Sequence, residues 1–426
     1  MDVGVIFNIV PRLLPIFMLG VVALVGLLLQ KKSGSDVISG TIKTMVGVAV
    51  LFAGVDLLVG AIEPIAALFG QVYAYEGSAA VGDWVGFLGT YGLQVVLIMV
   101  FGFLVNLILA RITPWKYVFL TGHILFWNAF MVTAALADGG KITGVALVVV
   151  GSIILGLIST IFPALVAPAI KKLTGTNDFS IGHTTTIHGI LGAWVGKLVG
   201  DPSKSTEDMN ISGAWGFMKS MTISTSVIMF LLYVVMGFVA GLPFAAETFA
   251  GGSTAMWFFV AGLKAITFGA GLTVLLTGVR IMLAEIIPAF HGLAQKVVPE
   301  AVPALDCPMI FPYGENALAI GFPIAMVFSL LALWVFGALG YKYLLLPLVV
   351  AAFFDVGPGV ILANATGGRR GAFIYAAIGG VLLMALNALA IPLVSNSAAG
   401  FVQLFGGNDF AIIAIIVGGI SRLLGF

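Results

Sequence analysis

Polar and ionisable residues gather in four short stretches of an otherwise strongly apolar chain. The stretches cover residues 119–128, 179–188, 303–316 and 364–370, and they contain histidine, carboxylate, amide and hydroxyl groups. Such side chains are costly at the depth of a lipid bilayer, so each is a functional candidate in a membrane protein. The candidates for contact with a small polar molecule are His123, Asn128, His183, Thr184, Asp306, Asn316 and Asn364.

Together these side chains offer both donors and acceptors of hydrogen bonds. That combination suits a polyhydroxylated solute better than a bare ion. Asp306 lies within the apolar stretch Pro-Ala-Leu-Asp-Cys-Pro, where a carboxylate is expected to accept hydrogen bonds from the hydroxyl groups of a ligand. The four histidines and one cysteine are far apart and have no ligand spacing, so the sequence predicts no metal and no other cofactor.

Each stretch also has a purely structural interpretation, and the residues alone leave it open. His123 can bond to a backbone carbonyl between helices, and residues 184–186 can bond back to their own helix. Asn364 and the glycines that follow it resemble a helix end and turn. Asp306 and Glu315 can pair with basic residues at the membrane surface.

The composition excludes an ordinary soluble domain. Hydrophobic residues make up 61% of the 426 residues, charged residues only 9%, and the mean hydropathy is +1.17; a soluble domain has about 25% charged residues. The formal charge of +1 argues against a nucleic-acid partner, and the single cysteine excludes an intramolecular disulfide framework. Apolar runs of bilayer length recur along the chain, so a polytopic membrane protein is expected.

An internal repeat runs through the chain with an offset of about 224 residues. Gly54-Val55, Pro64 and Gln71 recur as Gly278-Val279, Pro288 and Gln295. The charges differ between the copies, since Asp56 falls opposite Arg280 and Val72 opposite Lys296. A duplicated apolar unit whose loops differ in basicity predicts two copies inserted in opposite orientations, as in inverted-repeat transporters.

The elements that must position the polar stretches are membrane-spanning helices. We expect an all-α polytopic membrane protein of about 11 transmembrane helices, arranged as two inverted five-helix repeats plus a C-terminal helix, with re-entrant segments. The span starts lie near residues 13, 42, 93, 118, 143, 222, 256, 318, 343, 372 and 410, and the first apolar run is expected to be a retained span. The expected units are a first repeat (1–175), a cytoplasmic connecting segment (176–220), a second repeat (221–395) and a C-terminal transmembrane helix (396–426).

The basic residues predict the orientation. Three of them, Arg12, Lys141 and Lys342, fall on one side, and Lys264 lies at the edge of a span. The loops of the other side contain Lys31, Lys32, Lys43, Arg111, Lys116, Lys171, Lys172, Lys197, Lys204, Lys219, Arg280, Lys296, Arg369, Arg370 and Arg422. The positive-inside rule places this larger set in the cytoplasm, so the N-terminus is expected outside and the C-terminus inside. The chain has no P-loop, so transport must draw on an ion gradient, on partner proteins or on neither.

At the four polar stretches the chain resembles the membrane component (enzyme IIC) of the ascorbate-type branch of the bacterial phosphoenolpyruvate-dependent sugar phosphotransferase system, in the ascorbate/galactitol group. The resemblance is collinear and covers nearly the whole chain. It is carried by Gly40-Thr-Ile-Lys-Thr44, Leu120-Thr-Gly-His-Ile124, Phe179-Ser-Ile-Gly-His183, Gly278-Val-Arg280 with Ala284-Glu285, Ala289-Phe290 with Gly292, Asp306-Cys307, Asn316-Ala317 and Asn364.

The resemblance implies a homodimeric sugar permease of the bacterial inner membrane. It implies that His123, His183, Thr184 and Asp306 hold the sugar near mid-membrane, with Asp306 as the catalytic residue that steers the reacting hydroxyl. The phosphoryl donor is then a separate IIB protein, which a IIA protein charges. Where the ascorbate pattern has glutamines, this chain has residues 184–186 (three threonines) and Trp127-Asn128. The pocket should therefore differ in size and polarity, and the substrate class is a small sugar, sugar acid or polyol, with L-ascorbate as the first expectation.

Two other functions remain open from the sequence alone. An ion-coupled secondary transporter could use the same inverted repeat, with Asp306 or Glu315 carrying the proton or sodium ion. A stand-alone membrane enzyme could use histidine and aspartate on a lipid substrate. Neighbouring genes for IIA and IIB proteins would favour the permease, and turnover of a lipid without partners would favour the enzyme.

Overall fold

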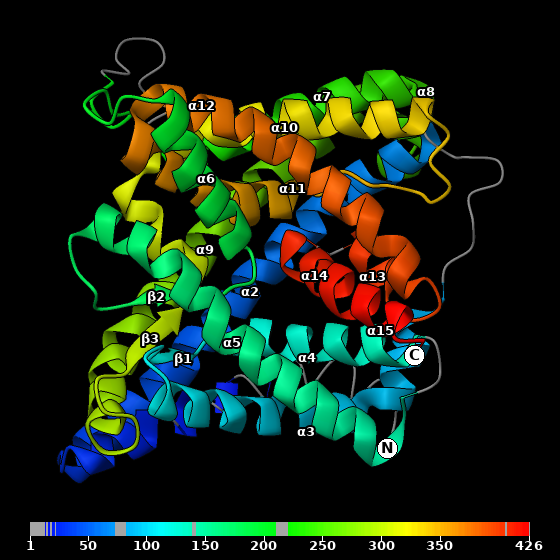
Figure 1. Cartoon of the computed structure of the whole chain (residues 1–426). Coiled ribbons are helices and arrows are strands. Elements are labelled where there is room, and N and C mark those ends of the chain that lie inside the picture. The colour runs from blue at the N-terminus through cyan, green and yellow to red at the C-terminus, as the bar shows by residue number, and fades with distance from the viewer. Residues whose placement is uncertain are drawn as a thin grey trace.

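A computed structural model of the chain describes residues 13, 16–17, 19–21, 23–72, 82–138, 142–209, 220–404 and 407–425 (Figure 1). Helices dominate, and three short strands accompany them. In chain order the elements are α2 (Gly34–Val72), α3 (Trp84–Ile112), β1 (Tyr117–Phe119), α4 (Gly122–Ala137), α5 (Gly144–Thr174), β2 (Ser180–Ile181), α6 (Thr186–Val199), α7 (Met221–Ala240), α8 (Leu242–Phe249), α9 (Thr254–Lys296), β3 (Val302–Leu305), a 3-10 helix (Cys307–Tyr313), α10 (Glu315–Ala338), α11 (Val349–Ala351), a π-helical turn (Ala352–Val356), α12 (Gly357–Ala390), a 3-10 turn (Ile391–Val394), α13 (Ala399–Leu404), α14 (Asn408–Ile413), a second π-helical turn (Ala414–Gly418) and α15 (Gly419–Leu423).

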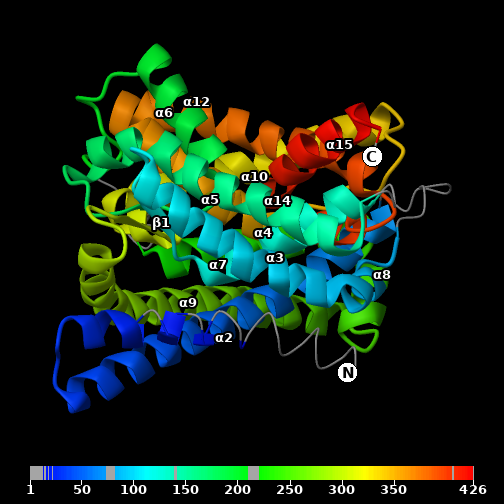
Figure 2. The ribbon, with the colours of Figure 1, turned by 60° about the horizontal axis from the view of Figure 1, so that its bottom comes forward.

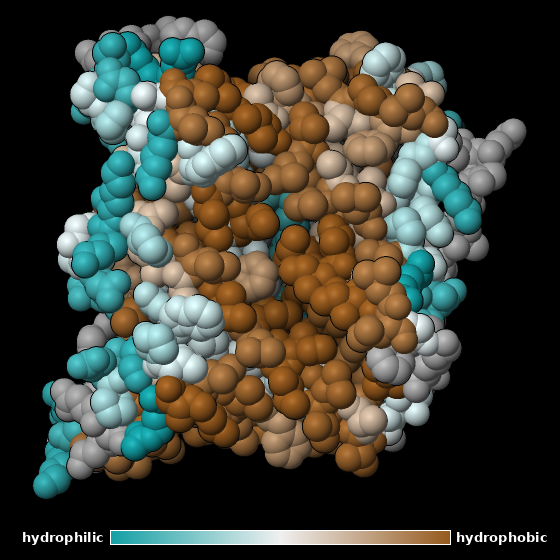
Figure 3. Space-filling view, in the orientation of Figure 1, coloured by the Kyte–Doolittle hydropathy of each residue, from teal (hydrophilic) through white to brown (hydrophobic). Residues whose placement is uncertain are grey.

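The surface is that of a multi-pass membrane protein. Hydrophobic residues cover the middle of the face in Figure 3, and hydrophilic residues gather along its left and right edges. Among the described residues, six helices are long and apolar enough to cross a membrane, or seven if the bent pair α7–α8 forms one span.

The expected number of 11 transmembrane helices is not confirmed by this count. The short helix α4 explains part of the difference: it has 16 residues, of which all but two are buried inside the protein. Its apolar sequence therefore reflects packing against protein on all sides, which hydropathy cannot distinguish from contact with lipid. The span expected to start near Leu13 lies partly outside the described residues.

The two longest helices, α2 and α9, lie side by side along one edge of the molecule (Figure 2). Glycines bring their backbones together: a Cβ atom at Gly54 would lie 2.4 Å from the backbone nitrogen of Leu275, and one at Gly278 would lie 2.3 Å from that of Leu51. Gly278 is 224 residues after Gly54, and Leu275 is 224 residues after Leu51. Gly54 of α2 therefore meets Leu275 of α9, and the residues at the matching positions, Gly278 of α9 and Leu51 of α2, meet in the same way.

The three strands form one parallel sheet in the order β1–β3–β2. Phe119 pairs with Ala304, and Ile181 pairs with Leu305. The buried Asn106 of α3 holds β1 in place, because its side-chain oxygen accepts from the Phe119 N–H at 2.9 Å and its amide nitrogen donates to the Tyr117 carbonyl at 3.1 Å. Since all three strands are parallel, their carboxyl ends open at the same edge of the sheet.

The described part of the C-terminal segment forms a hairpin within the protein, and the expected C-terminal transmembrane helix at 396–426 stays a prediction. Its two ends meet at the end of α4: the Ser397 hydroxyl donates to the Asp138 carboxylate at 2.6 Å, and the Arg422 guanidinium lies 3.6 Å from the same carboxylate. Between these ends the chain reaches Asp409, which bonds to His183. The segment therefore enters the protein and returns to the edge from which it came.

The hairpin also shows where the C-terminus lies relative to other helix ends. The end of α15 lies at the right edge of Figure 1 with the end of α4, whereas the C-terminal ends of α5 and α6 lie toward the left edge. Lys171 and Lys172 are in the last turn of α5. Arg422, which lies 3.6 Å from Asp138 at the end of α4, is thus at the opposite edge from these lysines. The expected cytoplasmic position of the C-terminus stays a prediction.

The hydrophilic loop that follows α6, residues 200–209, packs over a break in α12. Gly368 has φ 59° and ψ −163°, which interrupts the helix. The Asp201 N–H donates to the Gly367 carbonyl at 2.9 Å, and the Arg369 N–H donates to the Lys204 carbonyl at 2.8 Å. Within the loop, hydrogen bonds from the Ser203 hydroxyl and N–H lower the pKa of Asp201 below its ordinary value.

Candidate functional site

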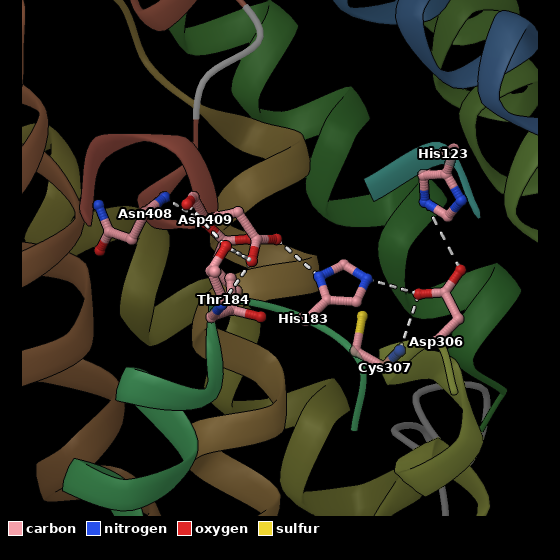
Figure 4. Close-up of polar contacts among 9 residues, drawn as sticks. His123, His183, Thr184, Asp306, Cys307, Asn408 and Asp409 are labelled. Carbon is pink, nitrogen blue, oxygen red and sulfur yellow. Dashed lines mark hydrogen bonds and ion pairs between the residues drawn. The ribbon is translucent and has the colours of Figure 1, made fainter. Parts of the chain in front are cut away.

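The parallel sheet brings three of the candidate residues together. Each follows the carboxyl end of one strand: His123 follows β1, His183 follows β2 and Asp306 follows the central strand β3. Their nearest ligand atoms all lie within 4.8 Å of one another. Figure 4 shows Asp306 between the two imidazole rings. Loops at the carboxyl ends of parallel strands are a common place for ligands, because side chains from separate segments converge there.

Asp306 is buried and uses its two carboxylate oxygens differently. Oδ1 lies 2.7 Å from His183 Nε2 and accepts from the Cys307 N–H at 2.7 Å. Oδ2 lies 3.7 Å from His123 Nε2, and both residues line a small cavity. One oxygen is therefore committed to the protein, and the other is available to a hydroxyl group of a ligand.

His183 lies between two carboxylates. Its Nε2 is 2.7 Å from Asp306 Oδ1, and its Nδ1 is 2.6 Å from Asp409 Oδ2. Both partners are acceptors when ionised, and an imidazolium, which has a hydrogen on each ring nitrogen, would satisfy both of them. The side chains of His183 and Asp409 are each only 5% exposed. A buried charge is tolerated when it is paired in this way.

Thr184 also contacts Asp409. Its hydroxyl lies 2.7 Å from Asp409 Oδ1 and 2.7 Å from the Asp409 carbonyl, and the Thr185 N–H donates to the same Oδ1 atom. The structure thus places Thr184, a candidate sugar ligand, against the C-terminal hairpin. Trp127, at the other departure from the ascorbate pattern, stacks on Phe401 with ring centroids 4.8 Å apart.

A small cavity adjoins Asp306 and His123. Leu120, Thr121, Gly122 and Leu305 line it from the sheet side. Val48 and Leu51 of α2 and Met282 of α9 close it from the other side, together with Leu19, which precedes α2. The volume open to the centre of a water molecule is about 10 Å³, which is room for about one water. A solute larger than water can therefore fit only if the lining residues move apart.

The side chains of Asn128 and Thr121 are buried and have no hydrogen-bond partner among the described residues. Asn128 of α4 is completely buried, and neither its amide oxygen nor its amide nitrogen is paired. The hydroxyl of Thr121, which lines the cavity, is also unpaired. An unpaired buried group costs about 1–3 kcal/mol. Both groups are therefore candidates to bond a polar ligand, and Thr121 was not among the residues expected from the sequence.

Asn316 and Asn364, the other two candidates, bind the hydrophilic loop. The Asn364 side-chain oxygen accepts from the Thr206 N–H at 2.9 Å, and the Asn316 amide donates to the Thr206 carbonyl at 3.1 Å. The Glu207 carboxylate accepts from the Asn316 and Ala317 N–H groups at the start of α10. The structure does not bring these two asparagines into contact with the histidines.

Three of the side chains could in principle hold a metal ion. His123, His183 and Asp306 are close enough for one ion to contact one atom of each. His183 would first have to lose its proton and its direct bond to Asp306, since an imidazolium has no free lone pair. As formed, the three side chains make a hydrogen-bonding site.

His188 belongs to a neighbouring network. Its Nε2 donates to the Asn408 side-chain oxygen at 2.6 Å, and its Nδ1 lies 2.8 Å from the Tyr375 hydroxyl. The family resemblance assigns His188 no role in the sugar site. The network still matters, because it fixes Asn408, the residue before Asp409.

Asp409 is the site residue that sequence reasoning missed. The last expected span began at Phe410, so the Asn408-Asp409 pair fell in the preceding turn. The sequence does contain a signal for Asp409, because this carboxylate comes shortly after two glycines and directly before a long apolar run. A carboxylate in such a position is a functional candidate because it is costly in lipid, as for Asp306. Asp355 is a second buried carboxylate of this kind, and it accepts from the Asn408 N–H at 2.6 Å.

Comparison with known proteins agrees with this site. The profile of the sugar-specific permease component of the phosphotransferase system, the EIIC-GAT family, matches residues 8–409. The chain is also similar to the ascorbate-specific phosphotransferase EIIC component of Mycoplasma pneumoniae, with 26% identity over 458 residues that cover 94% of this chain and 68% of the relative. Since the family profile spans nearly the whole chain, this protein belongs to the sugar-specific EIIC permeases of the phosphotransferase system.

Proposed function

We propose that this protein moves a small sugar, sugar acid or polyol across the membrane and presents it to a phosphorylated IIB protein, which a IIA protein recharges. L-Ascorbate is the first candidate substrate, because the relative from M. pneumoniae is ascorbate-specific. Family membership does not favour an ion-coupled transporter or a stand-alone enzyme. A homodimer in the inner membrane is part of the proposal.

The observation that carries the proposal is the convergence of His123, His183 and Asp306 beside a closed cavity. Imidazole and carboxylate groups there can bond several hydroxyls of one solute. In the phosphoryl-transfer step, Asp306 Oδ2 accepts the proton of the reacting hydroxyl. The sugar oxygen forms a bond to phosphorus, the bond between phosphorus and the IIB carrier atom breaks, and its electron pair stays on that atom.

We further infer that α2 and α9 are equivalent helices of two inverted repeats. The exchanged glycine contacts of Gly54 and Gly278 support this, because helices related by a local two-fold axis meet through equivalent positions. By the count of basic residues, the side that carries Lys171 and Lys172 is cytoplasmic, and the N-terminus is outside.

Uptake and phosphorylation in membrane vesicles test the function directly. Vesicles should phosphorylate one member of a panel of sugars, sugar acids and polyols only when phospho-IIB is supplied on the cytoplasmic face. Accumulation of unmodified solute that follows a proton or sodium gradient without IIB would refute the proposal.

The expected dock for IIB is the exposed basic surface formed by Lys171, Lys172, Lys197, Arg280, Arg369 and Arg370. Such a surface speeds association with an anionic partner and weakens with salt. Changing Lys171 and Lys172 to glutamate should slow phosphorylation in a salt-sensitive way and leave sugar binding intact. The same change at Lys31 and Lys32, which lie outside this surface, is the control. Equal effects of the two variants, or a parallel loss of sugar binding, would exclude the dock.

A further inference from the structure

The His183 ring joins two segments that approach from opposite edges of the protein. His183 follows β2 in the segment between α5 and α6, and Asp409 lies in the first turn of α14 in the C-terminal hairpin. Figure 4 shows the resulting line of Asp409, His183 and Asp306. Asp409 is 226 residues from His183 in sequence, so the tertiary structure alone brings them together.

Both carboxylate oxygens of Asp409 have hydrogen-bond donors as partners, and the Asp355 carboxylate bonds to the same turn. Oδ2 accepts from His183 Nδ1, and Oδ1 accepts from the Thr185 N–H and lies within bonding distance of the Thr184 hydroxyl. An ionised carboxylate suits these donors because both of its oxygens accept and neither donates. An asparagine would turn an amide N–H₂ group toward one of them.

The role of Asp306 depends on the state of His183. If Nε2 carries a hydrogen, it bonds to Asp306 Oδ1 together with the Cys307 N–H. Both donors then hold the carboxylate in one orientation, with Oδ2 toward His123 and the cavity. If His183 were neutral and Nε2 unprotonated, the ring would present a lone pair to the Asp306 carboxylate and the contact would be repulsive.

We propose that Asp409 is a positioning residue that holds His183 as an imidazolium, so that His183 donates to Asp306 and leaves Asp306 Oδ2 free for the reacting hydroxyl of the sugar. This inference rests on the proposed phosphotransferase function and adds a second, remote carboxylate to its machinery. Asp409 contacts neither the cavity lining nor the sugar directly; it acts through His183.

Two substitutions separate this role from a structural one. Asp409→Asn keeps the size of the side chain and removes the all-acceptor character, and Asp409→Glu keeps the charge. The matched control is Asp355→Asn: Asp355 bonds to the backbone of the same turn, where it accepts from the Asn408 N–H, and an amide oxygen can still accept there. The control therefore perturbs the turn and leaves the direct bond between Asp409 and His183 in place.

Phosphorylation by phospho-IIB is measured at saturating sugar together with equilibrium sugar binding. Asp409→Asn should lower the maximal rate about ten-fold or more, which corresponds to ~1.4 kcal/mol, and should weaken sugar binding by a smaller factor. Asp409→Glu should recover part of the rate, and Asp355→Asn should keep most of it. A normal maximal rate in Asp409→Asn overturns the proposal, as does an equal loss in the Asp355 control.

Nitrogen NMR of the histidine rings tests the same idea, and the protonation state is read on the unmodified protein. The chain has four histidines, and the three signals other than that of His183 are assigned by their loss in His123→Gln, His188→Gln and His291→Gln, so that the assignment does not require a variant of His183. Both ring nitrogens of His183 should be protonated at neutral pH; a neutral ring would overturn the proposal. If the wild-type protein does not phosphorylate any sugar with phospho-IIB, the proposed function itself fails. If the wild-type protein phosphorylates a sugar and the Asp409 variants do so at the same rate, the proposed function stands and this inference fails.

Discussion

Replacing Asp306 by asparagine removes one charge from the centre of the site and preserves the shape of the side chain. The amide oxygen can occupy the Oδ1 position and accept from His183 and from the Cys307 N–H, as the carboxylate does at 2.7 Å. The amide nitrogen then takes the Oδ2 position, where it can donate but cannot accept a hydrogen from a sugar hydroxyl. A buried donor without its acceptor costs about 1–3 kcal/mol, so the loss in phosphorylation should be about 5- to 150-fold.

The assay compares phospho-IIB-dependent phosphorylation in membranes that contain equal amounts of folded protein. Asp36→Asn is the matched control, because Asp36 is exposed at the start of α2 and bonds only locally to Ser33. The control should transport normally. Near-normal phosphorylation by Asp306→Asn would refute the reasoning, since it would show that neither the charge nor the Oδ2 acceptor is used. Loss of folded protein from the membrane would assign Asp306 to stability instead.

Three other variants test separate parts of the structure. His123→Ala should weaken sugar binding about ten-fold in an equilibrium binding assay, because one buried partner is lost; unchanged binding would remove His123 from the site. Gly54→Val should lower the melting temperature, because its Cβ would lie 2.4 Å from the Leu275 backbone, whereas Gly60→Val meets nothing within 4 Å and should be nearly neutral. With Cys307 replaced, membrane-impermeant maleimide added outside intact cells should label Arg422→Cys and not Ser203→Cys; the reverse pattern would invert the orientation.

Several features of the site could be predicted because they follow from the cost of polar groups in lipid. Asp306, His123 and His183 stand out in apolar sequence, and the structure brings these three together. The same rule selected Asn316 and Asn364, which instead hold the hydrophilic loop over the break in α12. Composition identifies a costly polar group, but it does not say whether a ligand or another part of the protein satisfies it.

The number of spans could not be predicted for a related reason. Helix α4 is as apolar as a membrane span, yet it is enclosed by protein. The C-terminal segment is apolar after Asp409, yet Arg422 near its end lies 3.6 Å from the Asp138 carboxylate, to which Ser397 at its start also bonds. Hydropathy measures the transfer of a side chain out of water, and protein and lipid are nearly equivalent by that measure. The positive-inside count placed Arg422 on the cytoplasmic side because it assumed that every apolar run crosses.

By itself the sequence determined that this is a polytopic helical membrane protein of the phosphotransferase permease family, since composition and local motifs need no knowledge of distant contacts. The sequence also predicted a repeat with an offset of 224 residues, and two glycines at that offset are contact points of α2 and α9. Only the tertiary structure decided which polar residues meet. The parallel sheet that aligns His123, His183 and Asp306 joins segments far apart in the chain. Asp409 reaches His183 through a hairpin from the opposite edge. A buried charge is tolerated when it is paired, and here the partner comes from a segment far away in the sequence.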